Sequence, residues 1–232
     1  MATAITIEAL TPQRLKMSYE EYLESSDDAR IVEWVNGEGI IYMPPLYPHQ
    51  NIVSFLDGLL RLFIEFFYLG VLIPAPFEVK LWPGGPSREP DLVVVTKENL
   101  AGLTDRRFEG APDLLIEIIS PGSVTEDRVH KFTEYEQAGV QEYWVIDPRP
   151  HQQQADFYVL GEDKIYHAAP VDDQGVFRST VLPHFWLQVD WLRQEQLPNP
   201  QLALAEIMVS IETLPAEIRE TYQTLRKLLT GK

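Results

Sequence analysis

Three short apolar runs constrain the fold of this chain more than any other feature. The runs are DLVVVT (91–96), DLLIEIIS (113–120) and EYWVID (142–147). Runs of this length, rich in β-branched and aromatic residues, are typical of strands that are buried on both faces of a sheet. Such strands need helices on both sides, so the sequence predicts an α/β (α+β) fold with a helix-covered sheet.

Two helices are expected to supply that cover. Residues 50–69 are mostly apolar except for Asp57, Arg61 and Glu65, whose i, i+4, i+8 spacing draws one polar stripe along a helix. This stripe indicates a helix that packs against the protein and does not cross a membrane. The second helix is predicted over 124–138 and is expected to end at the glycine that follows it.

The chain is predicted to form one domain with an extension at each end. Residues 1–16 read as an N-terminal tail, 17–192 as the main domain and 193–232 as a C-terminal helical extension. Asn36-Gly37 predicts a tight hairpin turn. The other expected elements are a helix with a capping box at Ser18 and Glu21, and strands at 31–35, 38–43, 71–82, 154–160, 164–168 and 185–190.

The charge and the composition exclude several classes of function. Acidic residues outnumber basic residues 35 to 19, and the formal net charge is −16. This charge repels polyphosphates at long range and counts against a tight, non-specific nucleic-acid binder, although a divalent cation can reverse the field locally. The chain has no cysteine, which excludes disulfides and cysteine–zinc sites. The N-terminal residues lack the apolar core of a signal peptide, so a cytoplasmic protein is expected.

Two carboxylates stand in the apolar runs where strand propensity alone would not place them. Glu117 lies inside LLIEII, and Asp91 opens DLVVV. A buried, isolated carboxylate costs several kcal/mol unless it is paired or binds a metal. Two alternatives stay open: Glu117 could face water or meet an arginine on an edge strand, and Asp91 could be a turn residue.

A lysine on the following helix is the third candidate. At about 100° per residue, Asp127, Lys131 and Tyr135 fall on one arc of that helix together with apolar residues. Lys131 could serve a site below the helix, or it could form an i, i+4 salt bridge to Asp127, and both can hold together. Tyr135 is expected to be a core residue.

These residues together predict a phosphodiester-hydrolysis site. If neighbouring strands bring Asp91 and Glu117 side by side, the two carboxylates cannot both ionise cheaply without a cation. Hard oxygen ligands with room for water suit Mg²⁺ or Mn²⁺. Such a metal lowers the pKa of bound water, and Lys131 aimed at the same spot could polarise the phosphate or the attacking water.

The ordered motifs EPDLVVV, APDLLIEIISPGS and DRVHKFTEYEQAGVQEYWVIDP resemble a restriction-endonuclease-like family within the PD-(D/E)XK nuclease superfamily. The similarity also takes in EWVNGEGIIYMPP and Pro48-His49, and it spans roughly residues 17–192. The resemblance implies a restriction-endonuclease-like core with a mixed central sheet flanked by helices. It also implies DNA cleavage that depends on Mg²⁺ or Mn²⁺.

The resemblance assigns the main roles in the site. Asp91 matches the aspartate of the PD half, and Glu117 matches the acidic residue of the second half. The superfamily expects a lysine two positions after that acid, where this chain has Ile119. In this family the lysine has moved to the next helix, which points to Lys131, the residue that the helical arc also selects.

Further roles follow from the same resemblance or from position. Glu33 matches an upstream glutamate that completes the metal site, and Glu38 is the alternative. The backbone carbonyl of Ile118 is expected to be a further metal ligand. His49 at a helix start could touch a phosphate or serve as a structural cap, and Arg128 is a second candidate for substrate binding.

The leading hypothesis is a Mg²⁺-dependent DNA endonuclease in which Glu33, Asp91 and Glu117 hold the metal and Lys131 orients or activates the water. Cutting both strands of a duplex needs two sites, so a homodimer is expected, and the C-terminal helices could supply the contact. A related hypothesis is that the chain is a metal-dependent hydrolase of a phosphodiester that is not a nucleic acid.

The alternative from a different class is a non-catalytic binding or assembly module that keeps the nuclease fold. The buried charges would then be satisfied by an Asp127–Lys131 pair and a Glu117–Arg128 pair. Binding of a divalent metal distinguishes this module from the enzyme.

Overall fold

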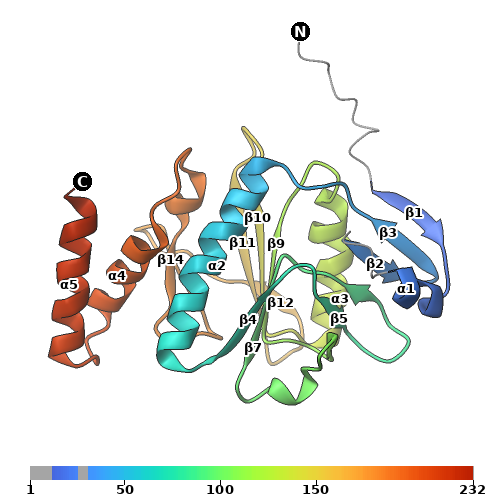
Figure 1. Cartoon of the computed structure of the whole chain (residues 1–232), viewed down its shortest axis with the longest axis horizontal. Coiled ribbons are helices and arrows are strands. Elements are labelled where there is room, and N and C mark those ends of the chain that lie inside the picture. The colour runs from blue at the N-terminus through green and yellow to red at the C-terminus, as the bar shows by residue number, and fades with distance from the viewer. Residues whose placement is uncertain (1–11, 26–30, 232) are drawn as a thin grey trace, which may run out of the picture.

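The computed structural model describes residues 12–25 and 31–231, which form two six-stranded sheets, one two-stranded sheet and the helices that cover them (Figure 1). The α-helices are α1 (Tyr19–Ser25), α2 (Tyr47–Phe67), α3 (Phe132–Ala138), α4 (Pro200–Ser210) and α5 (Ala216–Thr230). Shorter helical segments are the 3₁₀-helices η2 (Leu100–Gly102) and η4 (Val189–Arg193) and the π-helix η3 (Glu126–Lys131). The strands are β1 (Gln13–Lys16), β2 (Val32–Val35), β3 (Glu38–Ile41), β4 (Gly70–Pro74), β5 (Glu78–Lys80), β6 (Ser87–Arg88), β7 (Leu92–Thr96), β8 (Arg107–Glu109), β9 (Leu114–Ile118), β10 (Glu142–Asp147), β11 (Gln154–Leu160), β12 (Tyr166–Ala168), β13 (Val176–Arg178) and β14 (Trp186–Gln188).

The central sheet contains the three apolar runs as neighbouring strands. Its strand order is β12-β11-β10-β9-β7-β4. β9 and β10 are parallel, whereas β7 is antiparallel to both β9 and β4. The predicted mixed central sheet is therefore confirmed.

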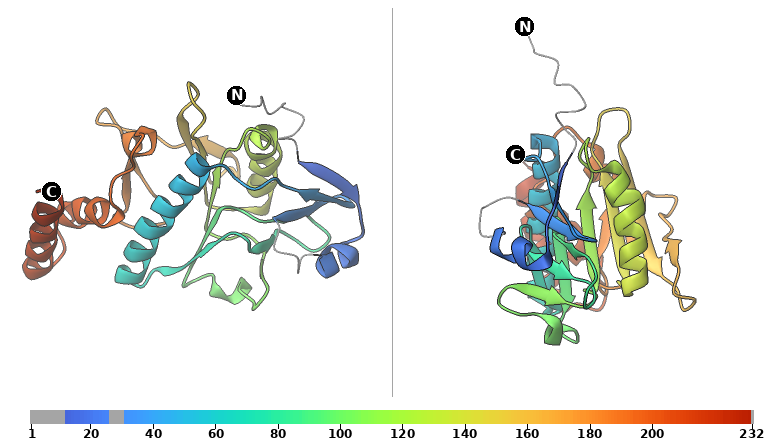
Figure 2. Two further views of the ribbon diagram at one scale, coloured as in Figure 1. Left: turned by 45° about the horizontal axis from the view of Figure 1, so that its top comes forward. Right: turned by 90° about the vertical axis from the view of Figure 1, so that its right-hand side faces the viewer.

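Each face of this sheet has its own hydrophobic core, because successive strand residues point to opposite sides. Leu92 and Ile116 pack with the apolar face of α2. Val93 and Leu115 point the other way and pack with Tyr135 of α3. The right-hand view of Figure 2 shows α2 and α3 on opposite sides of the sheet, as expected for strands that are apolar on both faces.

The second sheet, with strand order β1-β3-β2-β6-β5-β8, lies beside the central sheet (Figure 1). The β2–β3 hairpin turns at Asn36 and Gly37, whose φ angles of 51° and 83° agree with the predicted tight turn. The predicted capping box opens α1: the Ser18 amide donates to the Glu21 carboxylate at 2.7 Å, and the Glu21 amide donates to the Ser18 hydroxyl at 3.1 Å.

Several local predictions are wrong. Residues 13–16 are not part of a loose tail but form β1, which pairs with β3, while residues 1–11 lie outside the described residues. The strand predicted over 71–82 is divided into β4 and β5, and β6 lies at residues where no strand is predicted. β13 was not predicted. Strands of two to four residues are too short to show a periodic pattern in the sequence.

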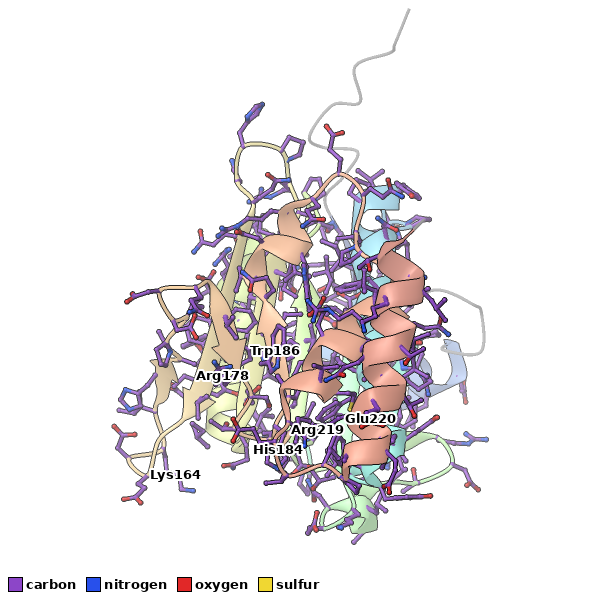
Figure 3. The ribbon with its side chains drawn as sticks, turned by 90° about the vertical axis from the view of Figure 1, so that its left-hand side faces the viewer. Lys164, Arg178, His184, Trp186, Arg219 and Glu220 are labelled. Carbon is purple, nitrogen blue, oxygen red and sulfur yellow. The ribbon has the colours of Figure 1, made fainter. Side chains whose placement is uncertain are left out.

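The C-terminal part forms helices where helix is predicted. α4 buries Leu204, Ile207 and Met208 in the core that α2 covers, whereas the described residues of α5 include no buried one. Figure 3 looks onto this end of the molecule, where the labelled Glu220 lies on α5 and Trp186 on β14. The Trp186 indole donates to the Ser210 hydroxyl at 2.8 Å and so connects β14 to α4. No helix in the described part of the chain is long and apolar enough to cross a membrane.

Candidate active site

Asp91 and Glu117 meet at the ends of two neighbouring strands. β7 and β9 pair with Leu92 opposite Ile116, so one further step of this antiparallel register places Asp91 across from Glu117. Alternate residues share a face, and both side chains therefore lie on the α3 side of the sheet. Asp91 Oδ2 accepts a hydrogen bond from the Ile118 amide at 2.7 Å. The two carboxylates thus lie side by side, as adjacent strands predict.

Lys131 contacts three carboxylates at once. Its Nζ is 2.9 Å from Glu117 Oε1, 2.8 Å from Glu33 Oε1 and 3.4 Å from Asp127 Oδ1. All four side chains are at most 4% exposed. The i, i+4 pair with Asp127 is present as predicted, and the contacts with β2 and β9 add two partners that are distant in the sequence.

The helix that carries Lys131 differs from the predicted one in its first turns. Residues 126–131 form a π-helix, and α3 begins only at Phe132. α3 ends at Gly139, whose φ of 92° provides the predicted glycine cap. A π-turn accommodates more residues than an α-turn, and such widened turns are frequent at functional sites. The 3.6-residue period of the sequence cannot reveal this local widening.

Arg88 is a site residue that the sequence analysis missed. Its side chain is 1% exposed, and Nη1 donates to Glu33 Oε2 at 2.8 Å. Nε and Nη2 donate to the carboxylate of Glu134 at 2.6 and 2.8 Å. Burial alone would raise the pKa of Glu33, but Lys131 and Arg88 hold this pKa at about 2. A single arginine in a proline-rich segment gives no sequence signal that it is buried.

Two tyrosines complete the hydrogen bonding of the carboxylates. The Tyr135 hydroxyl donates to Glu117 Oε1 at 2.8 Å, and the Tyr42 hydroxyl donates to Glu33 Oε2 at 2.8 Å. Tyr135 is fully buried, as expected of a core residue, and it also fixes Glu117. The helical arc identified the position of Tyr135 but not this contact.

The pKa values of Glu117, Asp127 and Lys131 depend on burial and on one another's charges. Burial raises the pKa of Glu117 well above its usual range, because the attraction of Lys131 is countered by Asp127 and Asp91. Burial likewise raises the pKa of Asp127 to about 6. For Lys131, burial favours the neutral amine, yet Glu117 and Glu33 raise its pKa well above the usual value. The carboxylates around Lys131 therefore favour its charged form.

The cluster lines a cavity of about 70 Å³ that reaches the N-terminal end of α2. His49 Nε2 lies 3.2 Å from Asp91 Oδ2, and His49 Nδ1 is buried without a hydrogen-bond partner among the described residues. The main polar lining residues are Glu33, His49, Glu89, Asp91, Glu117, Ser120, Ser123, Asp127 and Lys131. A cavity of this volume holds about two water molecules.

Two predicted contacts are corrected by the structure. Arg128 does not pair with Glu117; its Nη1 lies 2.6 Å from Asp156 Oδ2 on β11, and this contact draws Arg128 toward a different strand. Glu38, the alternative to Glu33, pairs with Arg14 at 3.3 Å on the half-exposed surface of the hairpin. The reason is the same in both cases. The register of the strands sets which residues face the cavity, and the position of a residue on a helix or in a turn does not reveal this register.

The donor set fits a hard divalent cation held by a pair of carboxylates. The acidic side chains of the cluster, Glu33, Asp91, Glu117 and Asp127, outnumber its basic side chains, Lys131 and Arg88. This excess of acidic groups suits a divalent cation, whose charge favours their ionised forms, and Mg²⁺ is commonly bound through one or two carboxylates and several waters. Across residues 12–25 and 31–231, no three histidine or carboxylate side chains form a ready metal-ligand group. Glu33 in particular uses its oxygens for Lys131, Arg88 and Tyr42.

Glu89 gives the protein a testable pH dependence. Burial and the neighbouring Glu33 raise its pKa from 4.5 to about 8, and its Oε2 has no hydrogen-bond partner among the described residues. The folded protein holds this proton more tightly than the unfolded chain, so stability falls as the pH rises from 4.5 toward 8. As the pH rises between these limits, the parent protein loses stability that Glu89→Gln keeps. We expect the free energy of unfolding of the variant to gain about 3 kcal/mol over that of the parent protein across this range. Urea unfolding at both pH values measures this gain.

The matched control for that experiment is Glu98→Gln, because Glu98 is exposed. Its unfolding free energy should follow the parent protein at both pH values. Parallel curves for Glu89→Gln and the parent would contradict the buried, protonated state of Glu89.

Comparisons with known proteins identify a family and a similar fold. The model of a family described as "Putative restriction endonuclease" matches residues 19–190. Among solved structures, a putative nuclease belonging to DUF820 from Anabaena variabilis is similar, with a TM-score of 0.61 and 19% sequence identity. The similarity covers 75% of this chain and 95% of that chain. A search of curated proteins found no match.

Proposed function

The chain belongs to the family of putative restriction endonucleases, and on that premise we propose that it is a metal-dependent endonuclease that hydrolyses phosphodiester bonds in DNA. One observation carries the proposal. Asp91 lies directly before β7, Glu117 on β9 and Lys131 on the helix that follows, and all three line one cavity. Two acids that can hold a divalent metal, beside a fixed cation, suit the hydrolysis of a phosphodiester.

Asp91 and Glu117, with the backbone carbonyl of Ile118, are the groups that would hold Mg²⁺ or Mn²⁺. When bound, the metal supplies Lewis-acid polarisation of the phosphate and lowers the pKa of a bound water. The Ile118 amide holds Asp91 at 2.7 Å, and Tyr135 holds Glu117 at 2.8 Å, so both acids are oriented before any ligand enters.

Lys131 is assigned an electrostatic role. Glu117 and Glu33 favour the charged form of its amine, and in this form the amine has no lone pair with which to act as a general base. Its N–H groups can donate to the phosphate or to the attacking water, and its charge stabilises the negative charge that develops there. Glu33, at 2.8 Å from the amine, is assigned to position Lys131 in place of the predicted role as a third metal ligand.

The first turn of α2 borders the cavity on the side where the substrate would bind. His49 reaches the cavity from the first turn of this helix, and that turn contains no acidic residue. A helix N-terminus attracts anions, so we assign His49 and this turn to a phosphate of the DNA. A homodimer would bring two such centres to the two strands of a duplex, and α5, which has no buried residue of its own among those described, is the proposed contact.

The alternative function, a non-catalytic module, is favoured by the pairing of Lys131 with three carboxylates, since a buried ion cluster can be purely structural. Metal binding separates the two functions. We expect saturating Mg²⁺ or Mn²⁺ to raise the melting temperature of the parent protein by roughly 5 °C, with no shift in Glu117→Gln.

The control for this titration is Glu142→Gln on β10. Glu142 is fully buried on the opposite face of the sheet, where it accepts hydrogen bonds from Thr180 and Trp144. This variant should melt lower but keep the metal response. A parent protein that does not respond to either metal would favour the structural module.

A further inference from the structure

The segment that joins β3 to α2 exposes an unusual amount of apolar surface. Met43, Leu46 and Tyr47 are 57%, 52% and 77% exposed, and two prolines lie between them. The segment ends at the N-terminus of α2, at the upper edge of the central sheet in Figure 1. Exposed apolar groups that are clustered in this way commonly mark a binding surface.

This surface is continuous with the catalytic cavity. Met43, Pro44, Pro45 and Leu46 line the cavity together with the acids of the candidate active site, and Tyr47 is the next residue. A strand whose phosphate enters the cavity from this side therefore passes this segment, which we call the apolar rim (residues 43–47).

The side chains of Glu117 and Lys131 are largely buried in this cavity. Glu117 and Lys131 are each 3% exposed, and the cavity that they line has a volume of about 70 Å³. A flexible single strand can bring a phosphate to such a space without the cost of unstacking bases that a bent duplex would bear.

Charge does not supply the affinity for such a strand. The chain carries a net charge of −16, and residues 43–51 contain no Lys, Arg, Asp or Glu. An aromatic or aliphatic surface binds an unstacked base through its π-face, and this contact does not depend on positive charge. The nearby α2 N-terminus, where Leu46 is the N-cap and makes no side-chain cap, leaves the first turn free for one phosphate.

We propose that the apolar rim is a stacking surface for an unpaired nucleobase, so that the substrate is single-stranded DNA or a locally unpaired stretch of a duplex. Tyr47 supplies the ring, and Met43 and Leu46 extend the apolar contact. This inference rests on the proposed endonuclease function, because it names the form of DNA that the same cavity accepts.

The test measures DNA binding apart from cleavage. Binding of a fluorescein-labelled oligonucleotide of about 12 nucleotides is followed by anisotropy in the Glu117→Gln background, which is expected not to cleave, with the oligonucleotide as a single strand and as the matching duplex. We expect the single strand to bind at least about tenfold more tightly than the duplex, and Tyr47→Ala to weaken the single strand about tenfold. An abasic nucleotide placed along the strand should weaken binding to the Glu117→Gln protein. It should not weaken binding to the variant that also lacks Tyr47.

The matched control is Tyr68→Asn. Tyr68 is 83% exposed at the other end of the same helix, and its φ of 52° is a conformation that asparagine tolerates. This variant should bind the single strand as tightly as its background. Thermal melting of every variant checks that the fold is kept. Tyr47 is mostly solvated, so its substitution should not lower the melting temperature.

The outcomes separate this inference from the proposed function. Equal binding of duplex and single strand, or no effect of Tyr47→Ala, overturns the stacking surface even if the parent protein cleaves DNA. A change of oligomeric state in Tyr47→Ala also overturns it and assigns the rim to an interface between copies. Binding that depends on Tyr47, without cleavage in Mg²⁺ or Mn²⁺, keeps the stacking surface and refutes the endonuclease.

Discussion

Glu117→Gln should cut DNA at least about a thousandfold more slowly than the parent protein in Mg²⁺, and Asp91→Ala should behave in the same way. The two acids lie side by side on the α3 face of the sheet, and each is expected to bind the metal. Losing either one removes several kcal/mol of transition-state stabilisation. Single-turnover cleavage of labelled DNA measures the rate.

The fold should survive these substitutions. Glutamine at position 117 keeps the shape of the side chain and can still accept hydrogen bonds from Tyr135 and Lys131. Glu142→Gln, on the opposite face of the same sheet, is the control and should cleave at the parent rate. Cleavage by both Asp91→Ala and Glu117→Gln at the parent rate would refute the assigned site.

Arg88→Met should lower the free energy of unfolding by about 3–5 kcal/mol. Arg88 is almost fully buried and binds Glu33 at 2.8 Å and Glu134 at 2.6 Å. Removing its charge leaves these carboxylates without their partner in a position where water cannot replace it. Urea unfolding near pH 7 measures the loss.

The comparison variant is Arg193→Met. Arg193 pairs with Asp190 at 3.0 Å, but both side chains are about half or more exposed, so its loss should cost less than about 1 kcal/mol. A similar small loss in Arg88→Met would mean that the buried network contributes little to the fold.

Cleavage should also fall in Arg88→Met, because Glu33 then no longer holds Lys131 in a fixed position.

The sequence contains enough information to find the centre of the site but not its supports. Asp91 and Glu117 could be found because a carboxylate in an apolar strand conflicts with its surroundings, and Lys131 because it lies on a buried helical arc. Arg88 could not be found, since its partners come from β2 and α3 and only the register of β2 with β6 brings them together.

The same reasoning explains the errors in the fold. The long apolar runs were located correctly because a period or a continuous run extends over many residues. β1 and β6 were missed because each is defined by its partner strand and not by its own composition. The π-helix at residues 126–131 depends on packing over the sheet, which no local pattern records.

The delivery of the amine from a neighbouring helix has a consequence for how similar proteins are recognised. Lys131 is 14 positions from Glu117 in the sequence, yet their charged atoms are 2.9 Å apart. A text pattern that demands an acid and a lysine at fixed spacing along one strand passes over such a chain. A template built from three-dimensional positions, two acids and one ammonium group, would retrieve it whichever element carries the ammonium group.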